Sequence, residues 1–173
     1  LLEGDDHRVE DNQLDDVLFG IHLKQVRRSR IAGNRITGKD LAPAMRGDGL
    51  RVWYSQHNVI EGNRFTRARD LTFANSADNR IVGNEFSDGR YGMHIVFSPR
   101  LLVENNRLTA TGTGIVVLYS PGLVLRGNHV AHALTDGGGG IVFKESDDAL
   151  VERNEVLHCS VGLRIDAPTQ SLG

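Results

Sequence analysis

The sequence predicts an all-β fold, a right-handed parallel β-helix (a solenoid) with about 22 residues per coil and roughly seven to eight coils. Two repeated features support this prediction. The first is a motif of an apolar residue, any residue, usually Gly, and then Asn, whose asparagines are Asn12, Asn34, Asn63, Asn84, Asn106, Asn128 and Asn154. The second is a strand start, a Gly or once Asp70, that lies 14 residues before six of these asparagines. All variation in length falls between an Asn and the next strand start, as a stacked core requires.

Each repeat is predicted to hold three short strands. The first follows the strand start and alternates apolar and variable residues, with inward residues such as Ile21 and Leu23. The second has an inward apolar residue such as Ile31, and the third has one just after the Asn, such as Ile36. Strands this short cannot bury their apolar side alone, so coils must stack in parallel, and parallel crossovers wind right-handedly. Stacked asparagine amides are expected to hydrogen-bond from coil to coil.

Glycine is unusually frequent, at 20 of 173 residues, where about 7% is usual. Ten of these glycines start the first strand of a coil or precede a motif Asn. At such positions a side chain would crowd its neighbours, or the backbone must turn left-handed. Five more lie in two insertions, residues 38–48 and the segment that contains Gly137, Gly138 and Gly139.

The chain is expected to be a single domain, residues 1–173, and a fragment of a longer solenoid. Leu1 falls at the inward position equivalent to Leu23, and residues 167–173 stop before another inward apolar residue. Neither end resembles a cap, and uncapped ends are open parallel strand edges. We therefore expect further coils or a partner to cover the ends.

Charge and cysteine content argue against several classes of protein. Twenty Lys and Arg against 22 Asp and Glu leave a formal charge of −2, so a basic nucleic-acid surface is not supported. No apolar run approaches the roughly 18 residues of a membrane-spanning helix, and the first residues lack the pattern of a secretion signal. The one cysteine, Cys159, permits no internal disulfide.

The outward residues of the first strand predict a partner surface. In the middle coils they are apolar although they should face solvent, and aromatic residues flank them. A contiguous apolar patch on a soluble protein usually marks an interface. Cover by one of the two insertions is the alternative. The predicted partner surface comprises Trp53, Tyr54, Ala74, Val96, Phe97, Val116, Leu118, Tyr119, Val142, Lys144 and Glu145.

Histidines provide one candidate metal site. His22 and His94 share a ladder position three coils apart, about 14 Å at about 4.8 Å per strand, which is too far for one ion. His132 and His158 each lie four residues after a motif Asn, so they should be neighbours in adjacent coils, with Cys159 beside them. Neutral imidazoles and a thiolate suit copper(I) or zinc. Two exposed turn histidines and a buried cysteine are the alternative.

Catalysis has less support, and no catalytic residue is predicted. β-Helices that act on acidic polysaccharides need clustered carboxylates, and no outward ladder position stacks acidic residues in consecutive coils. Most Asp and Arg residues, such as those in the segment from Arg67 to Asp70, are interpreted as solvated turns. A polysaccharide lyase, hydrolase or epimerase, or a carbohydrate-binding solenoid, remains the alternative, with residues 38–48 as one wall of a groove.

Several segments together resemble one family. RGDGLRVWYSQHNVIEGN, RARD, RYGMHIVFS, GTGIVVLYS and GGGIVFKES resemble NosD, the periplasmic β-helical protein of nitrous oxide reductase maturation. The likeness runs from Gly20 to Asp166. It implies a non-catalytic periplasmic accessory that works with the permease and ATPase subunits of an ABC-type transporter and delivers copper or related components to apo nitrous oxide reductase.

The resemblance also suggests site residues. His94 is the motif histidine, and Lys144 and Glu145 match a K-E pair of the family. The family's strands commonly hold methionines where this chain has Val96 and Leu118. Of the two methionines present, Met93 is a candidate ligand, although its predicted register points it inward. A structural or adhesive solenoid without a small-molecule site is a third hypothesis.

Overall fold

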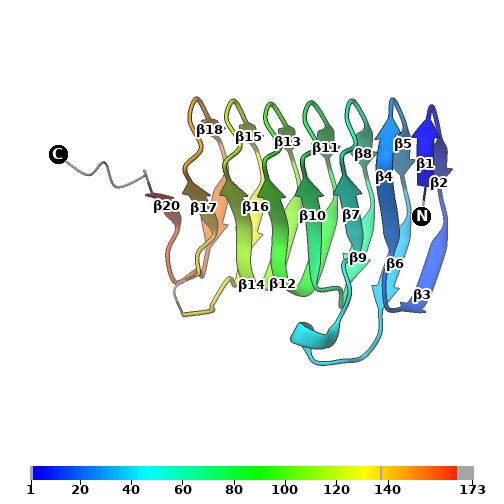
Figure 1. Cartoon of the computed structure of the whole chain (residues 1–173). Helices are drawn as coiled ribbons and strands as arrows, with labels where there is room; N and C mark the ends of the chain where they lie inside the picture. Colours follow the sequence, from blue (N-terminus) through cyan, green and yellow to red (C-terminus); the bar gives the residue numbers. More distant parts are fainter. Residues whose placement is uncertain (1, 137, 167–173) are drawn as a thin grey trace.

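The computed structural model describes residues 2–136 and 138–166 and confirms a right-handed parallel β-helix, with about seven turns (Figure 1). The coils stack from the N-terminal end to the C-terminal end, and each β-strand pairs in parallel with its equivalent in the next coil. Two sheets, of 13 and seven strands, enclose the core. No helix among the described residues is long and apolar enough to cross a membrane.

The strands follow the predicted three-part repeat. The first strands of the coils are β1 (Leu2–Asp5), β4 (Ile21–Arg27), β7 (Leu50–Trp53), β10 (Asp70–Ala74), β17 (Ile141–Lys144) and β20 (Leu163–Asp166). The second strands are β2 (Arg8–Glu10), β5 (Arg30–Ala32), β8 (Val59–Glu61), β11 (Arg80–Val82), β13 (Leu102–Glu104), β15 (Val124–Arg126) and β18 (Leu150–Glu152). The third strands are β3 (Gln13–Val17), β6 (Arg35–Gly38), β9 (Arg64–Thr66), β16 (His129–Ala131) and β19 (Glu155–Leu157).

Two strands run through a corner of the coil without a break. β12 (Glu85–Val96) and β14 (Arg107–Leu118) each combine the third strand of one coil with the first strand of the next. We call the outward sides of the first, second and third strands the first-strand, second-strand and third-strand faces. β12 and β14 therefore contribute to both the first-strand and the third-strand face.

The core is a stack of inward apolar side chains. Phe65 and Phe86 pair in register on the third strands, and Phe73 and Ile95 pair on the first strands; each is at most 1% exposed. Stacking identical positions brings apolar side chains into contact along the whole solenoid, which compensates for a coil too small to bury a core alone. The predicted inward register is thus confirmed.

The motif asparagines form the predicted ladder. The side-chain oxygen of Asn106 accepts hydrogen bonds from the backbone N–H and the side-chain amide of Asn84, at 2.9 and 3.0 Å. The same two bonds recur at every step from Asn12 to Asn154. Buried amides whose donors and acceptors are all used rigidify a turn, so this ladder fixes one corner of each coil.

A serine ladder, which the sequence analysis did not predict, fixes a second corner. The hydroxyl oxygen of Ser76 accepts the backbone N–H of Ser55 at 3.1 Å, and Ser98 and Ser120 continue the series. Each serine of this ladder stands six residues after a strand start; the serines are Ser55, Ser76, Ser98, Ser120 and Ser146. That constant offset is the sequence signal by which the ladder could have been found.

The two insertions differ in how they are held. The first contains the 3₁₀ helix η1 (Pro43–Met45), which hangs below the coils in Figure 1. The buried guanidinium of Arg46 donates to the carbonyl oxygen of Leu41 at 2.6 Å and to the carbonyl oxygen and carboxylate of Asp88 at 2.8 and 3.0 Å. This insertion is therefore tied to the coil of β12. Gly137 of the second insertion lies outside the described residues.

At the N-terminal end the observed register differs by one residue from the predicted one. Leu2, not Leu1, pairs with Leu23, because the pairing of β1 with β4 is irregular between Leu2 and Gly4. Leu1 itself and residues 167–173 lie outside the described residues. At the other end, inward positions of the last described coil are exposed, with Leu163 at 49%.

Candidate functional site

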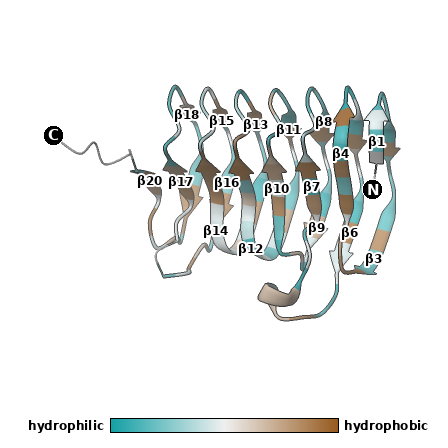
Figure 2. Cartoon of the chain, in the orientation of Figure 1, coloured by the Kyte–Doolittle hydropathy of each residue, from teal (hydrophilic) through white to brown (hydrophobic). Residues whose placement is uncertain are grey.

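The predicted partner surface forms a continuous strip on the first-strand face. Trp53, Ala74, Val96 and Leu118 occupy one outward register position on β7, β10, β12 and β14, and all four are half-buried. In Figure 2 the first strands of the middle coils are coloured as predominantly hydrophobic. The strip is thus a row of apolar side chains at the spacing of neighbouring strands, about 4.8 Å.

Aromatic side chains border this strip at the turn that follows the strands. Tyr54, Phe97 and Tyr119 have left-handed backbones, with φ of 48°, 48° and 49°. Their exposed fractions are 53%, 53% and 40%, and the rings of Phe97 and Tyr119 stack with centroids 5.0 Å apart. Exposed stacked rings offer a large apolar area at little cost in side-chain entropy, which is typical of interface residues.

One end of the predicted strip is covered. Val142 is only 6% exposed, whereas Val116, its neighbour in register, is half-buried. A side chain at Gly139 would come within 3.2 Å of Val142 Cγ2, so the backbone of the second insertion packs on this valine. Val142 is therefore covered by an insertion, which was the alternative to a partner surface. The solvent-exposed part of the strip ends before this residue.

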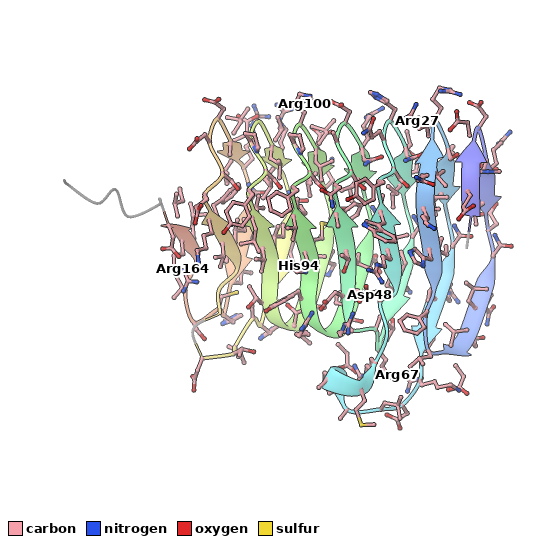
Figure 3. All side chains as sticks on the ribbon, viewed as in Figure 1. Arg27, Asp48, Arg67, His94, Arg100 and Arg164 are labelled. Atoms are coloured by element: carbon pink, nitrogen blue, oxygen red, sulfur yellow. The ribbon has the colours of Figure 1, made fainter. Side chains whose placement is uncertain are left out.

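A groove of about 240 Å³ adjoins the strip. His94 and Tyr91 stand at one side of it, with ring centroids 5.2 Å apart, and the exposed Lys144 lies along it. Its apolar lining is Val116, Leu118 and Val142. Figure 3 shows His94 in the middle of the first-strand face, between Asp48 and Arg164. The groove thus combines an apolar surface with an imidazole and an ammonium group.

Two aspartates whose charges act on His94 are buried. One of them, Asp70, belongs to the RARD segment, so the interpretation of that segment as a solvated turn is corrected here. Asp70 and Asp48 are 1% and 4% exposed. Arg90 donates to both carboxylate oxygens of Asp70, one at 3.1 Å, and Arg69 donates to Asp48 at 2.9 Å. The physical reason is that a buried carboxylate needs a partner, and the arginines of adjacent coils supply it. Both carboxylates are engaged, so they do not form an acid and base pair open to a substrate.

Burial lowers the pKa of His94 below the usual value of an imidazole. The carboxylate of Asp70 opposes this shift, and the guanidinium of Arg90 adds to it. The His94 imidazole is therefore neutral at pH 7 and above.

The lowered pKa of His94 predicts a loss of stability in acid. As pH falls through about 6.5, the unfolded chain takes up a proton at this histidine that the folded protein resists. The free energy of unfolding, measured by urea titration, should therefore fall between pH 7.5 and pH 5.5, and less steeply in His94→Gln than in the unmodified protein. The same pH dependence in both proteins would contradict this assignment.

The predicted metal ligands lie in three places. Met93 is fully buried in the core, so its thioether does not reach a surface site, and His94 stands in the groove described above. His132 and His158 are exposed neighbours whose rings stack 5.0 Å apart at 13°. The thiol of Cys159 donates to the carbonyl oxygen of Leu157 at 3.3 Å, and its side chain packs against the core.

These positions determine which copper chemistry the chain could support. In the described part of the chain, no three His, Cys, Asp or Glu side chains are arranged to hold an ion. Stacked imidazole rings hold their nitrogen lone pairs in nearly parallel planes. In the observed side-chain conformations the nitrogens of the two rings therefore do not point at one ion. Because both side chains are exposed, rotation could bring a nitrogen of each to one ion. Two exposed imidazoles therefore lie together in adjacent coils, while the Cys159 thiol is hydrogen-bonded to a backbone carbonyl.

Fold and surface together define the class of this protein: a parallel β-helix with an apolar and aromatic strip on one flat face. The chain belongs to the NosD family, because the family model described as "Periplasmic copper-binding protein (NosD)" matches residues 33–172. The predicted family is thus confirmed.

A curated relative gives a more distant comparison. The chain is 29% identical over 174 aligned positions to the "Probable ABC transporter binding protein NosD" of Pseudomonas aeruginosa. The alignment covers 92% of this chain but 36% of the relative. The chain therefore spans about a third of the length of the curated relative that it matches.

Proposed function

We propose that this chain is a non-catalytic periplasmic scaffold that docks an ABC-type transporter and nitrous oxide reductase during maturation of that enzyme. The observation that supports the proposal most directly is the open strip formed by Trp53, Ala74, Val96 and Leu118 with its aromatic border. Family membership and the printed name of the relative, which refers to an ABC transporter, point the same way.

The strip suggests the chemistry of its partner. Cationic side chains stand at its two ends, the exposed Arg51 beside Trp53 and the exposed Lys144 beside Leu118. A protein surface with an apolar centre and acidic residues on its rim would complement this arrangement. The apolar centre would supply most of the affinity, and the charges would orient the partner.

Replacing Val96 tests this proposal. A charge buried without a partner in an interface is strongly unfavourable, so Val96→Asp should weaken binding to the detergent-solubilised transporter at least tenfold and reduce the yield of active reductase in cells. Val124→Asp, at a half-buried outward position of β15 on the second-strand face between Leu102 and Leu150, is the matched control and should bind as the unmodified protein does. Equal binding by both variants would refute the docking role of the strip.

We further propose that His132 and His158 take up copper(I) as cargo. Imidazole is a suitable copper ligand, and two exposed histidines in adjacent coils can supply two ligands to one ion. The ion would be held weakly enough to pass to a partner, because the described residues offer no third ligand in place.

A competition titration with a colorimetric copper(I) chelator tests the histidine pair. His132→Ala and His158→Ala should each abolish the binding of one copper(I) equivalent, because one imidazole alone is a poor site. His57→Ala, which removes an exposed turn histidine, should leave the binding unchanged. Copper bound with equal affinity by the double variant His132→Ala/His158→Ala would exclude this pair.

We also propose, as expected from the sequence, that this single domain is part of a longer solenoid. Leu157, Leu163 and Ile165 stand at or beside core positions of the last described coil and are 38%, 49% and 68% exposed. Further coils would bury them as equivalent residues are buried in the middle of the stack.

A further inference from the structure

The third-strand face has two parallel ladders of polar side chains that the proposed function does not use. One outward register position reads Arg35, Arg64, Glu85 and Arg107 on β6, β9, β12 and β14. The next outward position on the same strands reads Thr37, Thr66, Ser87 and Thr109. Guanidinium groups and hydroxyl groups thus run side by side along the solenoid axis, over about 14 Å for three strand spacings.

Most of these polar groups have no partner among the residues that the structure describes. The carboxylate of Glu85 pairs with Arg64 at 2.7 Å. The ion pairs within residues 2–136 and 138–166 include neither Arg35 nor Arg107. On β6, β9, β12 and β14 three guanidinium groups therefore share one carboxylate, so this part of the face carries net positive charge although the whole chain has a formal charge of −2.

The ladders line two hollows that meet. A hollow of about 330 Å³ extends over Arg64, Glu85 and Arg107 with the hydroxyls of Thr66, Ser87 and Thr109. A second, of about 200 Å³, shares Arg64 and Glu85 and continues to Arg35. Gly62 and Gly83 leave its side open, since a side chain at either would meet nothing within 4 Å. Together they form a shallow polar groove along the axis, which we call the arginine groove.

The chemistry of the arginine groove selects its ligand. Guanidinium groups bind carboxylates in paired, charge-assisted hydrogen bonds, and hydroxyls donate to and accept from other hydroxyls. None of the eight outward residues is aromatic, so nucleic-acid bases have no ring to stack on. A peptide would add to a free strand edge, whereas β9, β12 and β14 are paired on both sides. We propose that the arginine groove binds a linear oligosaccharide that bears carboxylates, lying along the solenoid axis.

This proposal is independent of the docking strip, which lies on the first-strand face. Isothermal titration of the whole chain with an oligogalacturonate of defined length should give saturable binding that weakens as salt is added. Arg107→Ala should weaken this binding about tenfold, because it removes a charge-assisted contact. Thr66→Val and Thr109→Val should each weaken it about threefold, because the methyl group keeps the shape but cannot hydrogen-bond.

Two controls make the outcome decisive. Arg80→Ala removes an exposed arginine from β11 on the second-strand face and should bind as the unmodified protein does. Polyglutamate of equal charge should bind at least tenfold more weakly than the oligogalacturonate. Equal binding of polyglutamate would show attraction by charge alone and overturn the assignment to a saccharide. Absence of saturable oligogalacturonate binding, or equal loss in Arg80→Ala and Arg107→Ala, would overturn the site itself.

Discussion

Asn106→Ala should destabilise the protein by about 3–5 kcal/mol. The Asn106 side chain accepts two hydrogen bonds from Asn84 and donates two, to the carbonyl oxygen of Ile81 and the side-chain oxygen of Asn128, at 2.9 and 3.0 Å. The side chain is 1% exposed. Its removal therefore leaves the backbone N–H of Asn84 without its acceptor and takes a donor from the carbonyl oxygen of Ile81 and the side-chain oxygen of Asn128. Each buried group left unpaired costs about 1–3 kcal/mol. Urea unfolding followed by circular dichroism measures this loss.

The neighbouring Asn105 supplies the control. Asn105 is exposed and has a left-handed backbone, with φ of 54°. Glycine adopts that conformation without strain, so Asn105→Gly should change the free energy of unfolding by less than about 0.5 kcal/mol. If Asn106→Ala cost less than about 1 kcal/mol, the ladder would not hold the coils together.

Gly114→Ala should cost about 3 kcal/mol, because the new methyl group would overlap the next coil. A Cβ at Gly114 would clash with the carbonyl oxygen of Gly140 and with Cγ1 of Val130. The carbonyl oxygen of Gly140 is a backbone atom that accepts the N–H of Ile115 at 2.8 Å, directly before the parallel pairing of β14 with β17. The coil must therefore open locally, and hydrogen exchange should quicken in both strands.

The control is a glycine that has a left-handed backbone but no close contact with the next coil. Gly62 has φ of +61°, and a side chain there would meet nothing within 4 Å. Because asparagine tolerates the left-handed region, Gly62→Asn should cost less than about 1 kcal/mol. Equal losses of unfolding free energy in Gly62→Asn and Gly114→Ala would contradict this account, in which Gly114 is required for close packing and Gly62 only for its backbone conformation.

The sequence allowed most of the fold to be predicted, because a solenoid repeats one local rule in every coil. The spacing of Asn84, Asn106 and Asn128 predicted both the coil length and the amide ladder that the structure contains. The sequence predicted that glycines occupy turns and strand starts. In the structure, some of them have a left-handed backbone, as at Gly62, and others pack closely against the next coil, as at Gly114.

The residues that sequence reasoning missed depend on contacts between coils. Asp70 looked like a solvated turn residue, yet Arg90 of the next coil makes its burial possible. Val142 follows the pattern of an outward residue, but the second insertion covers it. The arginine groove, in contrast, could have been found from the sequence, because Arg35, Arg64 and Arg107 each directly follow a motif Asn and so share one outward register position. The insertion that covers Val142 and the contact of Arg90 with Asp70 follow no period, so periodicity could not place them.

The proposed function requires that the first-strand face docks the transporter. Site-specific photo-cross-linking tests it directly, with a photoreactive amino acid placed once at Leu118 on the strip and once at Val124 on β15 of the second-strand face. We predict a cross-link to a transporter subunit from position 118 and none from position 124. A cross-link from position 124 alone, or none from position 118 while the complex is intact, would contradict the claim.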